Sequence, residues 1–186
     1  MKQHREGIGA RALRPFLLGL CLLLVSGPGF AQKNQRISAD NYKTQYFSES
    51  LGWQTLWVNK EQREQIESIL GRNFKPFRIR YWGEVSRTGW LFEEIGKELP
   101  ITVAVVVEEG EIIDLTVLEF RESRGGEVVY PFFTGQFTSA KLEAGKTYGL
   151  DKHIDGITGA TLSVRALKKI ATLALYCDQQ TRLISE

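Results

Sequence analysis

The clearest hydrophobic pattern in the chain is a pair of apolar runs joined by a short polar turn. Residues 101–107 are apolar at every position except Thr102, which is typical of a strand buried on both faces of a sheet. Residues 108–110 favour a tight turn, and residues 112–120 follow as a partner strand with Ile113, Leu115 and Val117 on one face. The pattern predicts a β-hairpin whose first strand is central in a sheet.

Weaker patterns precede this hairpin. Asn59, with Gln62 three residues later, predicts a helix that begins with a capping box, and Gly71 predicts its end. From Phe77 to Gly83 the period of the apolar positions changes to two, which predicts a strand. Thr88-Gly89 predicts the turn after that strand.

The last pattern has the period of a helix, from about Ser163 to Cys177. Its apolar positions fit one helical face: Val164, Leu167, Ile170, Ala171 and Ala174. Together the elements predict an α+β fold in which helices pack on an antiparallel sheet. We expect a signal at residues 1–31, a loose polar lead-in at 32–54 and one domain at 55–186, with its core at 75–177.

The first 31 residues have the composition of an export signal. A basic start is followed by the short apolar run 16–25 and by small residues at Gly29 and Ala31, which predicts cleavage before Gln32. The run is shorter than the roughly 20 apolar residues of a membrane span, although an uncleaved anchor in the inner membrane is an open alternative. We therefore expect the mature protein in the periplasm of a bacterium.

Overall composition excludes several functional classes. Hydrophobic residues make up 42% and charged residues 25%, as in soluble globular proteins. The formal charge of +2 rests on basic residues of the predicted signal, so no nucleic-acid partner is expected. The two cysteines and two histidines predict neither a disulfide framework nor a histidine-based metal site.

The stretch from Asp155 to Ser163 carries the candidate chemistry. It precedes the last predicted helix, and a helix start offers free N–H groups and a partial positive charge to a phosphate. Gly156 and Gly159 leave room for a ligand, Thr158 adds a hydroxyl, and Asp155 has the chemistry to cap the turn or to coordinate a metal during a modification reaction. A phosphate-bearing ligand fits this stretch, and a plain capped turn is the alternative.

Residues 155–161, Asp-Gly-Ile-Thr-Gly-Ala-Thr, resemble the flavinylation motif of the FMN-binding domain family. That family includes covalent-flavin subunits of the sodium-pumping NADH:quinone oxidoreductase and of Rnf-type electron-transport complexes. The resemblance implies FMN joined to Thr161 by a phosphoester. It also implies a flavin transferase, which uses FAD and magnesium, as the partner that installs the cofactor outside the cytoplasmic membrane.

The resemblance extends to the hairpin 101–120, to the residues that follow it and to Gln136-Phe137. It implies no catalytic residue and the following cofactor-binding residues: Thr161, Asp155, Gly156, Thr158, Gly159, Ala160, Leu162, Ser163, Glu122, Gly125 and Gly126. Four aromatic residues are expected in the core, with stacking on the flavin as the alternative: Trp82, Trp90, Phe132 and Phe133.

The function implied is electron transfer through the FMN, to or from a redox partner that is membrane-bound. Residues 55–100 do not match the respiratory subunits, so membership in those particular complexes does not follow. Two alternatives stay open: a periplasmic flavin reductase of a small molecule, and a non-redox binding or assembly protein.

Overall fold

The structure, a computed structural model, describes residues 37–84, 86–143, 145 and 148–185. The predicted export signal, residues 1–31, lies outside the described residues. In the described part of the chain, no helix combines the length and the apolar character needed to cross a membrane.

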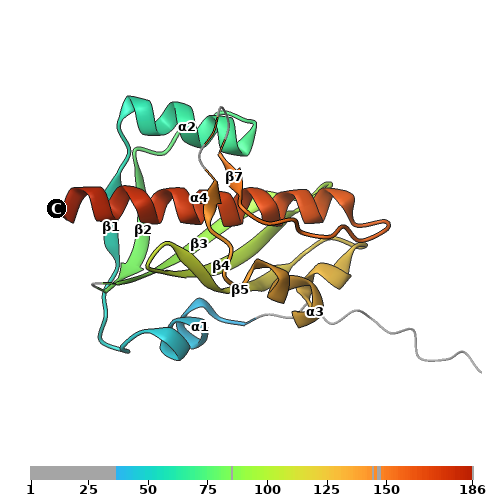
Figure 1. Ribbon diagram of the computed structural model, residues 1–186. Helices are drawn as coiled ribbons and strands as arrows, with labels where there is room; N and C mark the ends of the chain where they lie inside the picture. Colours follow the sequence, from blue (N-terminus) through green and yellow to red (C-terminus); the bar gives the residue numbers. More distant parts are fainter. Residues whose placement is uncertain (1–36, 85, 144, 146–147, 186) are drawn as a thin grey trace, which may run out of the picture. The chain divides into compact units, whose positions relative to one another are not determined.

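Five antiparallel strands form the main sheet, in the order of the chain (Figure 1). They are β1 (Gln54–Trp57), β2 (Arg78–Gly83), β3 (Arg87–Ile95), β4 (Pro100–Glu108) and β5 (Glu111–Phe120). The prediction of an α+β fold is confirmed. Strand β4 lies between β3 and β5, and its residues 103–107 are fully buried, so the predicted central strand is confirmed as well.

The connections between strands confirm one predicted turn and correct another. At the β4–β5 hairpin both Glu109 and Gly110 have positive φ, 49° and 85°, as a tight two-residue hairpin turn requires. The turn predicted at Thr88-Gly89 is wrong, because both residues lie inside β3 and pair with β4. The chain reverses earlier, where the Glu84 N–H donates to the Arg87 carbonyl at 2.8 Å.

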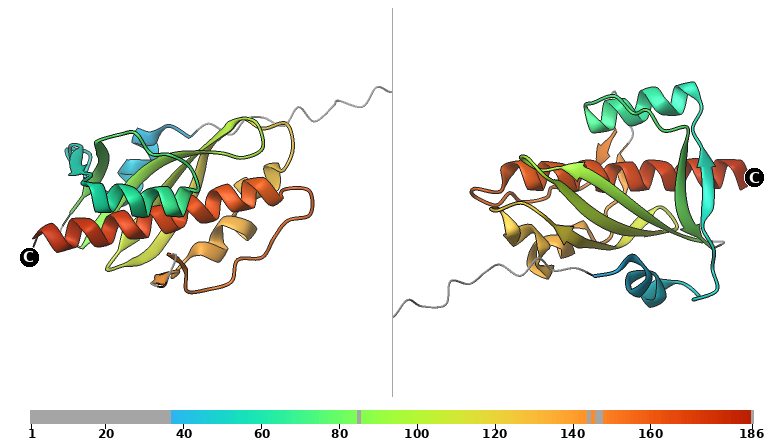
Figure 2. Two further views of the ribbon diagram at one scale, coloured as in Figure 1. Left: turned by 90° about the horizontal axis from the view of Figure 1, so that it is seen from above. Right: turned by 180° about the vertical axis from the view of Figure 1, so that it is seen from behind.

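Two helices cover one face of the sheet, α2 (Lys60–Leu70) and α4 (Thr161–Ser185) (Figure 2). Helix α2 begins with the predicted capping box of Asn59 and Gln62 and ends at Gly71, where φ is +67°. Helix α4 contributes to the core the apolar face that the sequence predicts, but it begins two residues earlier and ends eight residues later than expected.

The opposite face of the sheet is covered by α1 (Ala39–Tyr46), inside the segment predicted as a loose polar lead-in. That prediction is wrong from residue 37 onward, since Tyr42 is 1% exposed and its hydroxyl donates to the Asp114 carboxylate at 2.6 Å. Ile113 packs in the same cluster. A register shift in the β4–β5 ladder places Ile113 on the opposite face of the sheet from Leu115. The prediction that both lie on one face of β5 is therefore also wrong.

Short elements connect β5 to α4: η1 (Gly126–Val129), α3 (Pro131–Thr134), η2 (Gly135–Phe137), β6 (Leu142–Glu143) and β7 (Gly149–Leu150). Phe133 and Phe137 are fully buried and meet edge to face at 5.7 Å. With Trp82 and Trp90 also buried, three of the four aromatic predictions are confirmed. Phe132 is 65% exposed, so its placement in the core is wrong.

Candidate functional site

The start of α4 is built from a tight turn that leads directly into the helix. The Ala160 N–H donates to the Ile157 carbonyl at 3.0 Å, and Gly159 in this turn has a φ of +83° that favours glycine. The first helical bond runs from the Val164 N–H to the Ala160 carbonyl at 2.9 Å. Thr161 is therefore the first residue of the helix, and its side chain is exposed.

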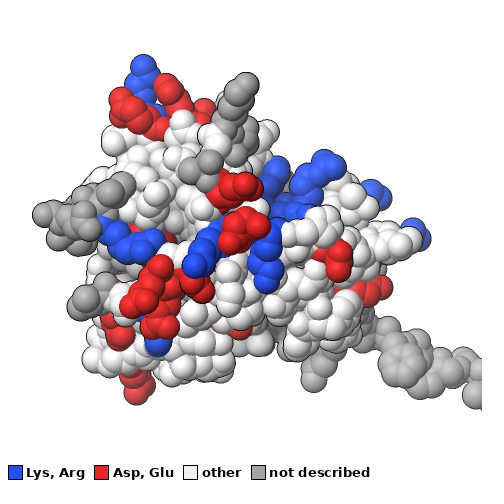
Figure 3. All heavy atoms as spheres, viewed as in Figure 1, with Lys and Arg blue, Asp and Glu red and all other residues white. Residues whose placement is uncertain are grey.

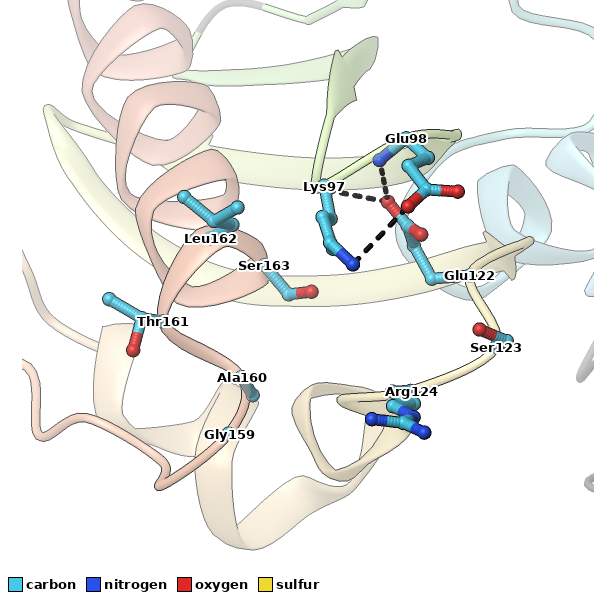
Figure 4. A pocket seen from close by; sticks show the side chains of 10 residues that line it. All are labelled: Lys97, Glu98, Glu122, Ser123, Arg124, Gly159, Ala160, Thr161, Leu162 and Ser163. Carbon is cyan, nitrogen blue, oxygen red and sulfur yellow. Dashed lines mark hydrogen bonds and ion pairs between the residues drawn. The ribbon is translucent and has the colours of Figure 1, made fainter.

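A cavity of about 550 Å³ lies beside this helix start (Figure 4). One wall is residues 159–163, and the other walls come from the turn after β3 and from the segment after β5. The lining residues are Lys97, Glu98, Glu122, Ser123, Arg124, Gly159, Ala160, Thr161, Leu162 and Ser163. The volume is in the range of small-molecule sites, about 300–1,000 Å³.

Glu122 fixes the shape of one wall. It is 9% exposed, and one of its carboxylate oxygens accepts the N–H groups of Lys97, Glu98 and Leu99 at 2.5, 2.7 and 3.0 Å. Burial opposes the charge of this carboxylate, but the three N–H donors and the nearby Lys97 ammonium outweigh it and lower the pKa of Glu122. These three hydrogen bonds, the Glu122 clamp, hold the β3–β4 turn at the edge of the cavity.

Gly125 brings the segment after β5 against the start of α4. Its φ is +78°, and a Cβ on this residue would lie 3.1 Å from the Cβ of Ala160 and 3.3 Å from the Ser163 Oγ. Only glycine combines this backbone conformation with so close an approach. Gly126 is buried at the start of η1, and neither glycine lines the cavity.

Asp155, Gly156 and Thr158 lie on the exposed approach to the helix and do not line the cavity. The Asp155 N–H donates to the Gln136 side-chain carbonyl at 2.8 Å, and the neighbouring Ile154 is 1% exposed. These two contacts hold a stretch that is otherwise open to solvent. The structure therefore brings together Glu122 and residues 159–163 of the predicted set, and it presents Asp155, Gly156 and Thr158 outward.

Three basic side chains lie near the helix start. Lys97 and Arg124 line the cavity, and Arg165 is exposed one turn of α4 after Thr161. Figure 3 shows Lys and Arg side chains gathered over the N-terminal half of α4. Because the N–H groups of the first helical turn have no carbonyl to donate to within the helix, they add partial positive charge at the same place.

Lys97 and Glu98 are site residues that the sequence did not indicate. Their side chains form an ion pair of 3.2 Å and are both 72% exposed. Charged residues between two strands are typical of any surface turn, so no local signal separates these two from the rest. Only the Glu122 clamp, made across more than twenty residues of sequence, places them in the cavity wall.

The cavity combines a helix start, two cations, two carboxylates and a buried serine, and its size and helix start are those of sites that bind small phosphate-bearing ligands. Residues 96–176 match the family model described as FMN-binding domain, and this part of the chain belongs to that family. The matched range contains every residue that lines the cavity. FMN, which carries one phosphate, fits the size of the site and the free N–H groups of its helix start. No curated protein and no solved structure matches the chain.

Proposed function

We propose that the protein is a periplasmic electron-transfer flavoprotein that carries FMN linked by a phosphoester to Thr161. The observation that carries this proposal is the position of the Thr161 side chain. It is exposed at the first residue of α4, beside the cavity, and it ends the motif on which the resemblance rests. When bound, FMN supplies the electron-transfer chemistry, and the protein supplies the attachment and the surroundings.

Attachment is the work of a flavin transferase that uses FAD and magnesium. Transfer of the FMN half of FAD to the Thr161 Oγ forms one phosphoester bond, breaks the diphosphate bond and releases AMP. A basic group of the transferase accepts the hydroxyl proton. The exposed stretch 155–159 is accessible to such an enzyme, and Asp155 to Ala160 serve as its recognition sequence.

The chain's own residues then hold the phosphate and shape the pocket. The N–H groups of the first α4 turn and the cations of Lys97 and Arg124 attract the phosphate. Glu122 and Ser163 form the wall behind it, and Gly125 packs against Ala160 and Ser163 outside the cavity. Electrons pass to or from a membrane-associated respiratory partner, and the export signal expected at residues 1–31 agrees with that location.

The test is to co-express the full chain with a flavin transferase, export it, and measure intact mass and in-gel fluorescence after denaturation. We expect one FMN to be retained by the wild type and by Thr161→Ser, which keeps the hydroxyl, and to be lost in Thr161→Ala. Covalent flavin in Thr161→Ala would refute the assignment of Thr161. A wild type without covalent flavin would refute the phosphoester.

A further inference from the structure

The turn between β3 and β4 brings two opposite charges to one edge of the cavity. Lys97 Nζ and Glu98 Oε1 are 3.2 Å apart, and both side chains line the cavity while remaining 72% exposed. In Figure 4 the Lys97 ammonium points from this turn toward Ser163 on α4. The Glu98 carboxylate lies on the far side of that ammonium from the helix start.

The backbone that carries these two charges is held in place. The N–H groups of three consecutive residues, 97–99, donate to one oxygen of the buried Glu122 carboxylate. Gly96 allows this approach, because a Cβ there would lie 2.9 Å from the same oxygen. The Lys97 and Glu98 side chains therefore extend from a backbone that is held in place. Removal of either charge changes the electrostatics of the cavity without moving its wall.

Glu122, the other acidic residue of the cavity wall, has little electrostatic effect on the cavity. Three N–H donors face the Glu122 carboxylate, and such donors compensate a buried negative charge. Arg124 makes no ion pair with any residue that the structure describes. Lys97 and Glu98 are thus adjacent, exposed and oppositely charged groups beside one site. Their charges act on the electrostatic potential of that site with opposite signs.

We propose that Lys97 and Glu98 set the reduction potential of the FMN held at this cavity, with Lys97 raising it and Glu98 lowering it. The inference rests on the proposed function for the presence of the flavin. Charge near a flavin ring is one of the ways in which a protein tunes the cofactor. A positive charge stabilises added electrons and a negative charge destabilises them, and salt weakens both effects when the groups are exposed.

The test compares Lys97→Gln and Glu98→Gln in the flavin-loaded full chain. Both variants keep the backbone N–H groups that Glu122 binds. Midpoint potentials are measured by reductive titration with dithionite, which supplies the electrons, against a reference dye. We expect a more negative potential for Lys97→Gln, a more positive one for Glu98→Gln, and smaller shifts in 0.5 M than in roughly 0.05 M salt.

Lys60→Gln is the matched control. Lys60 begins α2, whose Gln62 bonds to Gln180, a residue roughly 28 Å along α4 from Thr161 by the rise of a helix. Its removal should leave the potential unchanged. Unchanged potentials in both site variants, or shifts of the same sign, would overturn the inference. Retention of FMN after denaturation is measured separately and tests the phosphoester alone. If the protein does not retain FMN, the potentials are measured with non-covalently bound FMN.

Discussion

The Glu122 clamp can be broken with one substitution, and its contribution to stability follows from its contacts. Glu122→Ala removes the acceptor of three N–H groups on the β3–β4 turn. Hydrogen bonds to a charged group contribute about 1.5–3 kcal/mol each. The three bonds share one oxygen on a turn that solvent reaches in part, so we expect a combined loss of about 3 kcal/mol in the free energy of unfolding.

For a chain of this length, such a loss lowers the melting temperature by roughly 6–12 °C. Glu122→Gln keeps one acceptor oxygen, removes the charge and replaces the second oxygen with an amide NH₂ group, so we expect about half the loss. Urea unfolding of the flavin-free protein, followed by circular dichroism, measures both variants. The control is Glu127→Ala, an exposed glutamate of the same connecting segment, which should change stability by less than about 0.5 kcal/mol.

The same contacts predict a dependence on pH. Because the pKa of Glu122 is lowered in the folded state, its charge adds stability above the unfolded-state pKa of about 4.3. That stability is lost as the pH falls through the lower, folded-state pKa. The difference between wild type and Glu122→Gln should therefore shrink below about pH 4. A loss under about 1 kcal/mol for Glu122→Ala, or a difference that does not change with pH, would contradict the clamp.

Two further predictions test the packing on either side of the sheet. Gly125→Ala introduces a Cβ at positive φ and 3.1 Å from the Cβ of Ala160, so we expect a loss of about 1–3 kcal/mol in urea unfolding and less covalent FMN by intact mass. Gly135→Ala, where a Cβ meets nothing within 4 Å, is its control and should be nearly neutral. Tyr42→Phe removes the hydrogen bond to Asp114 and should lower the free energy of unfolding by about 2 kcal/mol; a loss under about 0.5 kcal/mol would contradict a stabilising role for this bond.

The elements that the sequence predicts correctly are those with local signals. The capping box of Asn59 and Gln62 and the left-handed Gly71 determine helix α2 through contacts within the helix and its ends. The hairpin of β4 and β5 needs only two apolar runs and a turn at residues 109–110. Such features can be predicted from the sequence because each residue's role depends on neighbours a few positions away.

The features that the sequence does not indicate depend on distant contacts. Helix α1 is largely polar, and Tyr42 and Phe47 are buried only because Trp82 and Leu118 of the sheet meet them. The effect of Glu122 on the β3–β4 turn is equally non-local. The sequence predicts Glu122 as a cofactor contact, and that stays a prediction, while one carboxylate oxygen already accepts three bonds from the protein.

A residue that an enzyme modifies must be accessible before the reaction and firmly held after it. Residues 155–159 meet the first requirement, since they have no helical or strand structure and only Ile157 among them is half-buried. Helix α4 meets the second, because Leu167 and Ile170 are fully buried against the sheet. Thr161 lies where the exposed stretch ends and the buried helix begins. The proposed attachment at that residue would transmit the rigidity of the core to the cofactor, and it would leave the approach open on the side of the motif.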